Sequence, residues 1–466
     1  MTPTVLVLEL NELCTPLLDR FMAEGLLPNV ARLRAESARF TTDAEETGDR
    51  LQPWVQWVTA HTGVGLDEHG AFKLGEGAVN SCSTVADVVG EAGGDVWLCG
   101  PMNVVPTQVV HGRWLPDPWN PDATLVPPDL APFAEFVRAN VQEHTNERHR
   151  LSARSYVDFL AFMARHGLSP ATVAEVGRQL GGERVGRRSR WQRTALLDRF
   201  QWDVFRSEWK HNRPQFATYF SNTAAHYQHL YWRHLDPDAF PLRPDDAEIA
   251  TYGPAVRSGY QEVDRLVGDA LDLVGEQGTL VLCTALGQAP FTEGDDDGGS
   301  RFYRPYDVVA FVRALGLPEP EHTSPVMSEQ FHLFFTTEAK AEAAAGALQT
   351  ATVDLESAFT VRRVGCDVFS GFNLVSDLPA DAEIEVPVTG ARVGVHDYLY
   401  RAETSRSGSH VPEGVLWIRA PGGVTGERSE PVPLRSLAPT LLHLMGLEPA
   451  SSMTAPILPV GEPAPA

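Results

Sequence analysis

Three histidines and an asparagine are grouped near the middle of the chain, in the stretch FSNTAAHYQHLYWRH at positions 220–234. If this stretch is helical, Asn222, His226 and His229 lie at i, i+4 and i+7, so their side chains share one face. Imidazole nitrogens and an amide oxygen can converge on a zinc-like ion or on an anion. The pattern predicts such a polar site, with the alternative that the histidines hydrogen-bond inside an aromatic-rich core.

The elements that must position these residues alternate between strands and helices. Strand-like runs occur at 4–10, 94–98 and 278–283, and the first, TVLVLEL, has the unbroken apolar character of a strand covered on both faces. Helical periodicity separates the runs, for instance in VDRLVGDALDLVGEQ at 263–277. The alternation predicts a three-layer α/β/α sandwich with a mostly parallel central sheet, in which ligands gather at the carboxyl ends of the strands.

The whole chain, 1–466, is expected to form one α/β domain. Between about 128 and 212 the periodicity is continuously helical and rich in arginine, which predicts a helical insertion that is a candidate lid. The acidic run GDDDGGS at 294–300 is expected to be a solvated turn. The proline-rich tail, 453–466, is expected to be loosely ordered.

The composition favours a small-molecule substrate over a macromolecular partner. The formal net charge of −23 repels phosphate backbones and anionic lipids, so we expect neither nucleic acid nor membrane as a partner. The five cysteines have no paired spacing, which argues against disulfides and a cysteine-type zinc site. There is no apolar run of about 18 residues, and MTPTVLVLEL lacks the features of a signal peptide. We therefore expect a cytoplasmic protein.

Five motifs occur in an order that is similar to the alkaline phosphatase superfamily, especially its phosphodiesterase and nucleotide pyrophosphatase-like branch. They are VLVLELNELCTPLL with LPNVARLRAES, HTGVGLDEHG at 61–70, NTAAH at 222–226, SGSHVPEGVLWIRAPG, and LRSLAPTLLHLMGLEP near the C-terminus. The resemblance spans nearly the full length. It implies an α/β fold and two metal ions, held by three aspartates and three histidines around a threonine, serine or modified cysteine nucleophile, as suits displacement at phosphorus.

The chain departs from that pattern at most of the functional positions. Where the family carries aspartate or histidine ligands, four positions read Asn11, Asn222, Ala285 and Leu286. The ligand positions that are kept are His226 and His410. The place of the nucleophile falls in LQPW at 51–54, which has no hydroxyl. Two divalent ions need anionic ligands, because burying an uncompensated charge costs several kcal/mol, so these departures argue against a two-metal site.

The resemblance then implies at most one divalent metal ion, zinc or manganese, bound by His226, His410 and, one turn along, His229. Other polar groups are expected to orient the substrate anion by hydrogen bonds or to move protons. For orientation these are Asn11, Gln52 and Asn222, and for proton transfer Glu9 and His61. Trp54 and His69 are expected to line the substrate pocket, although core packing explains both residues as well.

The function predicted from the sequence is hydrolysis or transfer of a phosphoryl or sulfuryl group on a small molecule, without a hydroxyl nucleophile. A transferase whose acceptor attacks directly fits the missing hydroxyl. The alternative is a catalytically inactive pseudoenzyme that keeps the fold and acts as a binding or scaffold protein.

Overall fold

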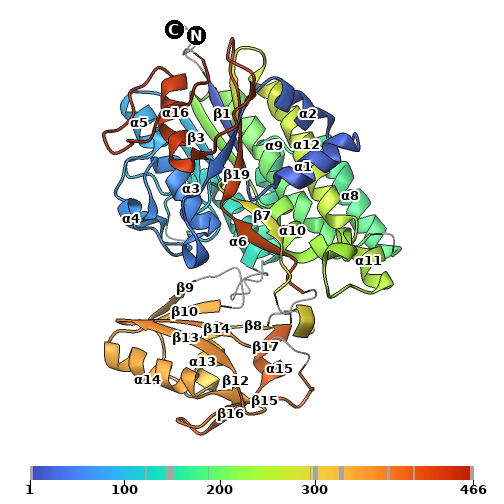
Figure 1. The fold of residues 1–466 in the computed structure, drawn as a ribbon, viewed down its shortest axis with the longest axis vertical. Coiled ribbons are helices and arrows are strands. Elements are labelled where there is room, and N and C mark those ends of the chain that lie inside the picture. Colours follow the sequence, from blue (N-terminus) through green and yellow to red (C-terminus); the bar gives the residue numbers. More distant parts are fainter. Residues whose placement is uncertain are drawn as a thin grey trace.

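A nine-stranded, mostly parallel sheet forms the centre of the molecule in the computed structural model (Figure 1). The structure describes residues 4–120, 123–142, 152–186, 188–293, 295–297, 303–324, 330–374, 378–401 and 405–461. The strand order is β20-β2-β19-β6-β1-β5-β3-β4, and β21 also pairs with β2. The strands are β1 Val5–Leu10, β2 Ala38–Asp43, β3 Val96–Cys99, β4 Gly112–Leu115, β5 Phe216–Ser221, β6 Thr279–Cys283, β19 Glu413–Arg419, β20 Gly426–Glu427 and β21 Val432–Pro433.

Strand β1 lies at the middle of the sheet, parallel to β5 and β6, with Leu8 opposite Tyr219 on one side and Leu282 on the other. All six residues of β1 are buried, because both faces of the sheet are covered. Strand β19 runs antiparallel between β6 and β2. The predicted α/β sandwich with a mostly parallel sheet is confirmed.

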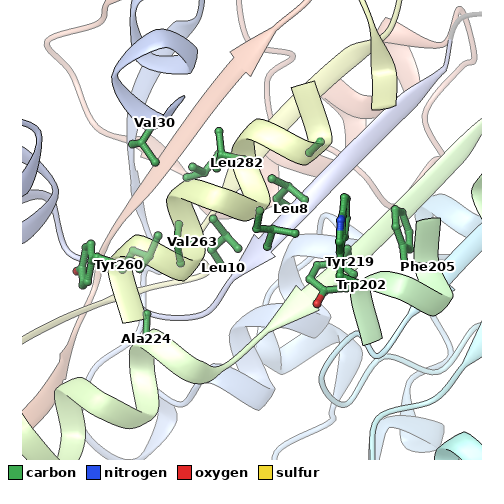
Figure 2. Close-up of a cluster of buried hydrophobic side chains, with 14 of the residues drawn as sticks. Leu8, Leu10, Val30, Trp202, Phe205, Tyr219, Ala224, Tyr260, Val263 and Leu282 are labelled. Atoms are coloured by element: carbon green, nitrogen blue, oxygen red, sulfur yellow. The ribbon is translucent and has the colours of Figure 1, made fainter. Parts of the chain in front are cut away.

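Helices cover both faces of this sheet. The helices on one face are α1 Thr15–Ala23, α2 Pro28–Ala35, α9 Thr194–Asn212, α10 Thr223–Leu235 and α12 Ala255–Val274. Figure 2 shows part of their shared core, in which Leu8 and Leu10 of β1 pack near Tyr260 and Val263 of α12. The opposite face is covered by α3 Pro53–Thr62, α5 Val85–Glu91 and α16 Leu437–Leu444, which share a second core with Val5 and Val7.

The described residues between 128 and 212 form α6 Ala131–Gln142, α7 Ala153–Arg165, α8 Pro170–Arg184 and α9, with a short 3-10 turn, Arg190–Arg193, directly before α9. Helix α9 carries this helical segment onto the sheet, where Trp202 and Phe205 pack against Tyr219 of β5. Helices α4 Leu66–His69 and α11 Asp246–Tyr252 are short connections.

Residues 303–399 contribute a third core, which is separate from the two that cover the sheet (Figure 1). Two four-stranded sheets, β13-β14-β10-β9 and β12-β11-β15-β16, pack with helices here. The elements are β8 Tyr303–Pro305, α13 Val308–Ala314, β9 His322–Ser324, β10 Gln330–Phe334, α14 Glu338–Gln349, β11 Thr352–Val353, β12 Glu356–Ser357, β13 Phe359–Val364, β14 Asp367–Phe372, β15 Glu383–Val386, β16 Ala391–Gly394, α15 Val395–Tyr398 and β17 Leu399–Arg401. An ion pair of 2.6 Å between Lys73 Nζ and Asp367 Oδ2 joins this segment to the main body.

Two stretches that were expected to be solvated or loose have buried residues. Asp295, in the acidic run 294–300, forms an ion pair of 3.0 Å with Arg233, and both side chains are almost fully buried. In the tail, Leu458 and Val460 pack into the core of the α16 face. The expectation of a loose tail therefore does not describe these residues, and 462–466 lie outside the described part. None of the helices in the described residues is long and apolar enough to cross a membrane.

Candidate functional site

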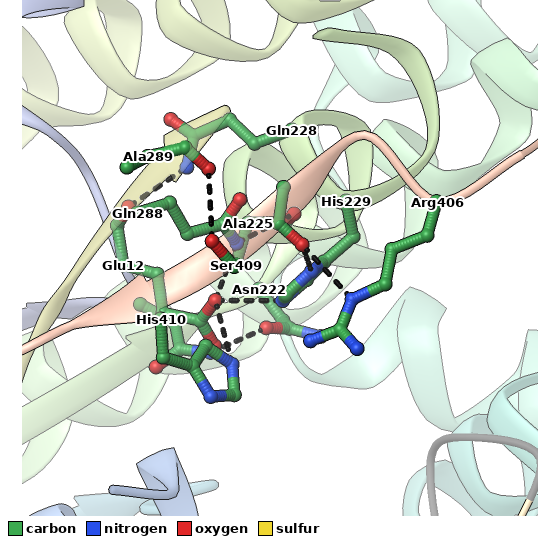
Figure 3. Close-up of polar contacts among 12 residues, drawn as sticks. Glu12, Asn222, Ala225, Gln228, His229, Gln288, Ala289, Arg406, Ser409 and His410 are labelled. Carbon is green, nitrogen blue, oxygen red and sulfur yellow. Dashed lines mark hydrogen bonds and ion pairs between the residues drawn. The ribbon is translucent and has the colours of Figure 1, made fainter. Parts of the chain in front are cut away.

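Three ionisable side chains meet where β1, α10 and the short strand β18 (Gly408–Val411) come together (Figure 3). Glu12 follows β1, His229 lies on α10, and His410 lies on β18. Glu12 Oε2 is 2.8 Å from His229 Nε2 and 3.4 Å from His410 Nε2. Among the described residues these side chains form a group able to hold a metal ion, with one ligand atom from each within 4.8 Å of the others.

Hydrogen bonds to backbone carbonyls decide which nitrogen of each imidazole faces Glu12. His229 Nδ1 donates to the oxygen of Gly408 and His410 Nδ1 donates to that of Leu51, each at 3.1 Å. Because a carbonyl oxygen can only accept, each Nδ1 carries a proton. Each Nε2 then directs a lone pair at the Glu12 carboxylate, unless it is protonated as well. Lone pairs that face an anionic oxygen repel it, so the geometry requires a cation, either bound protons or a metal ion.

The backbone of Glu12 and both of its carboxylate oxygens are held by amide side chains. Asn11 Nδ2 donates to Glu12 Oε1 at 2.7 Å, and Gln288 Nε2 donates to Oε2. Gln228 Nε2 donates to the Glu12 backbone oxygen at 2.8 Å. The carboxylate is therefore fixed by neutral donors as well as by the two imidazoles, an arrangement that orients a metal ligand or satisfies a buried anion.

Burial and backbone conformation both mark Glu12 as unusual. Burial by itself would raise the pKa of Glu12, but the imidazoles of His410 and His229 outweigh it and hold this pKa well below its ordinary value. The residue has φ 57°, the left-handed region that glutamate rarely adopts. Such strain persists where surrounding contacts enforce it, and it is concentrated at functional sites.

Two of the predicted anion-orienting residues, Asn11 and Asn222, are brought together beside Glu12. Asn11 Nδ2 donates to Asn222 Oδ1 at 2.8 Å, and Trp57 Nε1 donates to Asn11 Oδ1 at 2.9 Å. Asn222 is half-buried at the start of α10. Its amide nitrogen has no acceptor in the part of the chain that the structure describes.

Gln52 precedes α3 and follows Leu51, whose carbonyl binds His410, so it lies next to the same centre. Ala285 and Leu286, at the positions of the missing Asp-His pair, are fully buried apolar residues. His226 is not part of the group with Glu12. Its backbone N–H donates to Asn222 O at 2.9 Å, and its ring centre lies 6.0 Å from that of Tyr227.

Glu9 and His61, predicted to move protons, pair with each other in the core between the sheet and α3. His61 Nε2 is 2.7 Å from Glu9 Oε1, and the side chains are 5% and 1% exposed. The pair lines a void of about 10 Å³ together with Trp57 and Leu441. Glu9 Oε2 and His61 Nδ1 have no hydrogen-bond partner among the described residues. Neither residue belongs to the group around Glu12, and their role in proton transfer stays a prediction.

Trp54 and His69, the predicted pocket residues, make hydrogen bonds within the fold. Trp54 Nε1 donates to Phe72 O at 3.1 Å. His69 is buried, accepts from Ala71 N–H at its Nδ1, and has its Nε2 3.2 Å from Thr59 Oγ1. Burial lowers the pKa of His69 to about 4. These contacts are those of structural residues, and a role in substrate binding stays a prediction.

Glu12 and Gln288 were not predicted from the sequence as site residues. The signal for Glu12 was its position, since it is an ionisable residue directly after the first strand and next to Asn11, at the place of the glycine in the Asp-Gly motif that this segment resembles. Gln288 follows β6 within the short strand β7 (Gly287–Pro290), which pairs with β18. Both residues therefore follow parallel strands at the edge where ligands were expected.

No protein-family model matches the sequence, and no curated protein matches it either. Among solved structures, phosphonoacetate hydrolase from Sinorhizobium meliloti 1021, in complex with phosphonoformate, has a TM-score of 0.43 and 13% sequence identity, and the match covers 93% of this chain and 92% of that chain. Murine ectonucleotide pyrophosphatase/phosphodiesterase 5 in complex with AMP has a TM-score of 0.42 and 9% identity, with 96% of each chain covered. Both solved structures are members of the alkaline phosphatase superfamily, the family that the sequence motifs resemble.

Proposed function

We propose that this protein hydrolyses or transfers the phosphoryl group of a small molecule at a centre that holds one divalent ion, zinc or manganese. Glu12, His229 and His410 would be the ligands, a set that replaces the one expected from sequence, His226, His229 and His410. One carboxylate and two imidazoles suit zinc or manganese. The proposal includes the predicted absence of a hydroxyl nucleophile, since LQPW provides none at the start of α3.

The observation that carries this proposal is the direction of the two imidazoles. Both Nδ1 atoms donate to carbonyl oxygens, so both Nε2 atoms converge on one buried carboxylate oxygen. Hydrogen bonds from the Nδ1 atoms of histidine ligands to fixed acceptors are the usual way in which proteins orient metal ligands. Fully apolar neighbours at Ala285 and Leu286 support a count of one ion, since they provide no ligand for a second.

A bound divalent ion would supply positive charge to an oxygen of the phosphoryl group. The side chains of this protein would orient the phosphoryl group. Asn222, fixed through Asn11, would donate to a phosphoryl oxygen the amide hydrogens that have no acceptor among the described residues. In the hydrolytic reaction a water oxygen forms a bond to phosphorus while the bond from phosphorus to the leaving oxygen breaks. The water proton is released and the leaving oxygen gains a proton, so a monoester yields an alcohol and phosphate.

Metal content tests the ligand set directly. The protein is loaded with zinc or manganese, dialysed, and analysed for bound metal per chain. We expect one ion in the wild-type protein and a metal affinity at least about 100-fold lower in Glu12→Gln, His229→Ala and His410→Ala, since even partners behind the ligands contribute 10- to 100-fold. His226→Ala is expected to keep its bound metal. If the ligands were His226, His229 and His410, as expected from the sequence, this variant would lose metal affinity.

His211→Ala is the control, because His211 is exposed on α9 and its Nδ1 donates to Ser207 O within its own helix. A wild-type protein that binds no divalent ion, or an unchanged metal content in His229→Ala, would contradict the proposal. Hydrolysis of phenyl phosphate by the loaded protein, and its loss in the same variants, tests the activity.

The alternative is a binding or scaffold protein without turnover. It is favoured by the buried Ala285 and Leu286 and by Gln52 at the place of the nucleophile. Saturable binding of phenyl phosphate by the loaded protein, with the ester recovered intact after prolonged incubation, would support this alternative over the enzyme.

A further inference from the structure

Arg406 is an arginine at the edge of the Glu12 centre, and it has no carboxylate partner within the described residues. Its Nε donates to the backbone oxygen of Gly408 at 3.2 Å. Its guanidinium carbon lies 4.4 Å from the centre of the Phe291 ring, a stacking contact that restrains the side chain. The side chain is half-buried, so the two terminal nitrogens remain available to a ligand.

The position of Arg406 is defined by an acceptor that it shares with a proposed metal ligand. Gly408 O accepts from Arg406 Nε and also from His229 Nδ1 at 3.1 Å. The guanidinium and the imidazole are therefore neighbours. In Figure 3 one terminal nitrogen of Arg406 is directed toward Asn222, whose amide nitrogen is without an acceptor in the described chain.

The backbone that carries Arg406 is held firmly. The N–H of Ser407 donates to His229 O at 2.7 Å. The backbone oxygen of Arg406 accepts from Arg233 Nη2 at 2.7 Å, and Arg233 in turn forms the buried ion pair with Asp295. A cation on a fixed backbone with a restrained side chain loses little conformational freedom when it binds an anion. Arg406 is thus preorganised for recognition.

We propose that Arg406 and Asn222 form a binding site for a dianionic phosphoryl or phosphonyl group, beside the ion held by Glu12, His229 and His410. This inference rests on the proposed function and names its substrate class. The guanidinium offers two N–H groups in a planar fork that matches two oxygens of the anion. The Asn222 amide offers a further donor to a third oxygen.

The charge of the site selects among anions. A divalent ion, the Arg406 guanidinium and the Glu12 carboxylate together leave two positive charges. A phosphate monoester or a phosphonate carries two negative charges and neutralises them, whereas a sulfate ester or a phosphodiester carries one. Partial burial strengthens this difference relative to bulk water. The site therefore favours monoesters and phosphonates over sulfate esters and diesters.

The test compares two ligands of the same shape that are not hydrolysed, phenylphosphonate and benzenesulfonate, by calorimetric titration of the metal-loaded protein at pH 8.5. We expect the wild-type protein to bind the dianionic phosphonate at least about 10-fold more tightly than the monoanionic sulfonate. In Arg406→Met the affinity for phenylphosphonate should fall about 10- to 100-fold, as expected for a lost charged hydrogen-bond pair. The affinity for benzenesulfonate should fall by a smaller factor, so the ratio of the two affinities should become smaller than in the wild-type protein. Arg406→Lys, which keeps the charge without the fork, should be intermediate.

Arg392→Met is the matched control, since it removes one positive charge from an exposed arginine in the 303–399 segment. Equal wild-type affinities for the two ligands would overturn the proposal, and so would unchanged phenylphosphonate affinity in a folded Arg406→Met variant. Metal content is measured on every sample. A metal-free wild-type protein contradicts the proposed function, while the effect of Arg406→Met on phosphonate affinity, measured on that same protein, still decides the role of Arg406.

Discussion

At the scale of single residues, Glu12 combines a strained backbone conformation with a buried carboxylate. It adopts φ 57°, where a non-glycine residue costs about 1–2 kcal/mol, and it is buried at 2% exposure. Glycine would adopt this conformation without that cost. A glutamate at this strained position is explained if its carboxylate binds a metal ion together with His229 and His410. Metal analysis of Glu12→Gln tests this role.

A second residue-scale prediction concerns His69, whose pKa is lowered to about 4 by burial. An unfolded histidine titrates near pH 6.5, so between about pH 6.5 and 4 the folded protein binds fewer protons than the unfolded chain. As the pH falls through this window, His69 therefore lowers the free energy of unfolding by about 3 kcal/mol in total. In His69→Gln the loss of unfolding free energy between pH 7 and 4 should be smaller by about that amount.

Urea denaturation of the wild-type protein and His69→Gln at several pH values measures the difference. His111→Gln, at an exposed histidine, serves as the control for the replacement of a histidine by glutamine. Parallel profiles for the wild-type protein and His69→Gln would show that His69 titrates alike in the folded and unfolded states.

At the scale of secondary-structure elements, the site depends on how β18 is attached to α10. The attachment is the hydrogen bond from Ser407 N–H to His229 O, together with the buried pair of Arg233 and Asp295. Arg233 also bonds the backbone oxygens of Leu242 and Arg406. A single buried guanidinium thus holds the segment that presents both Arg406 and His410.

Arg233→Met should destabilise the protein by about 3–5 kcal/mol, because it leaves the buried carboxylate of Asp295 without its partner. Amide hydrogen exchange at Ser407 should also become faster. The control is Arg243→Met, at an exposed arginine that pairs with Asp238 at 3.0 Å, for which about 1 kcal/mol or less is expected. Similar unfolding free energies for the two variants would mean that the Arg233 pair does not anchor the β18 segment.

At the scale of the whole molecule, the chain contains a core at 303–399 that is separate from the two cores of the sheet. The sequence pattern predicted one domain over 1–466 and gave no separate signal for this segment. Its strands are short and pair within the segment, and its described contacts to the main body include the Lys73–Asp367 ion pair. Stability can therefore differ between the segment and the α/β body.

Phe311→Ala tests this separation. Phe311 is fully buried among Phe359, Phe372 and Tyr398, so its loss should cost about 3–5 kcal/mol. Hydrogen exchange followed by mass spectrometry should show faster exchange within 303–399 and unchanged exchange in β1 and β5. Val364→Ala, at a valine that is 70% exposed, should alter neither region. Faster exchange throughout the molecule after Phe311→Ala would show that the cores unfold together.

The sequence by itself determined the sheet and the edge at which the site lies. Unbroken apolar runs predicted buried parallel strands, and the helical spacing correctly predicted a helix that carries His229, although Asn222 lies directly before its first residue. Periodicity is a local property, so it can be read without knowledge of distant contacts. The proximity of Asn11 to Asn222 follows from the parallel pairing of β1 and β5, because the carboxyl ends of parallel strands lie at the same edge of the sheet.

Only the tertiary structure decided which side chains meet. His226 and His229 are separated by about one helical turn, and the choice of His229 depends on where β18 crosses α10, at the bond from Ser407 to His229. Glu12 joins them because its backbone takes a positive φ after β1, which turns its carboxylate toward both imidazoles. Glu9, two residues earlier on the strand, is directed into the opposite core instead. These outcomes depend on contacts between residues up to about 400 positions apart, which the local pattern of a sequence does not encode.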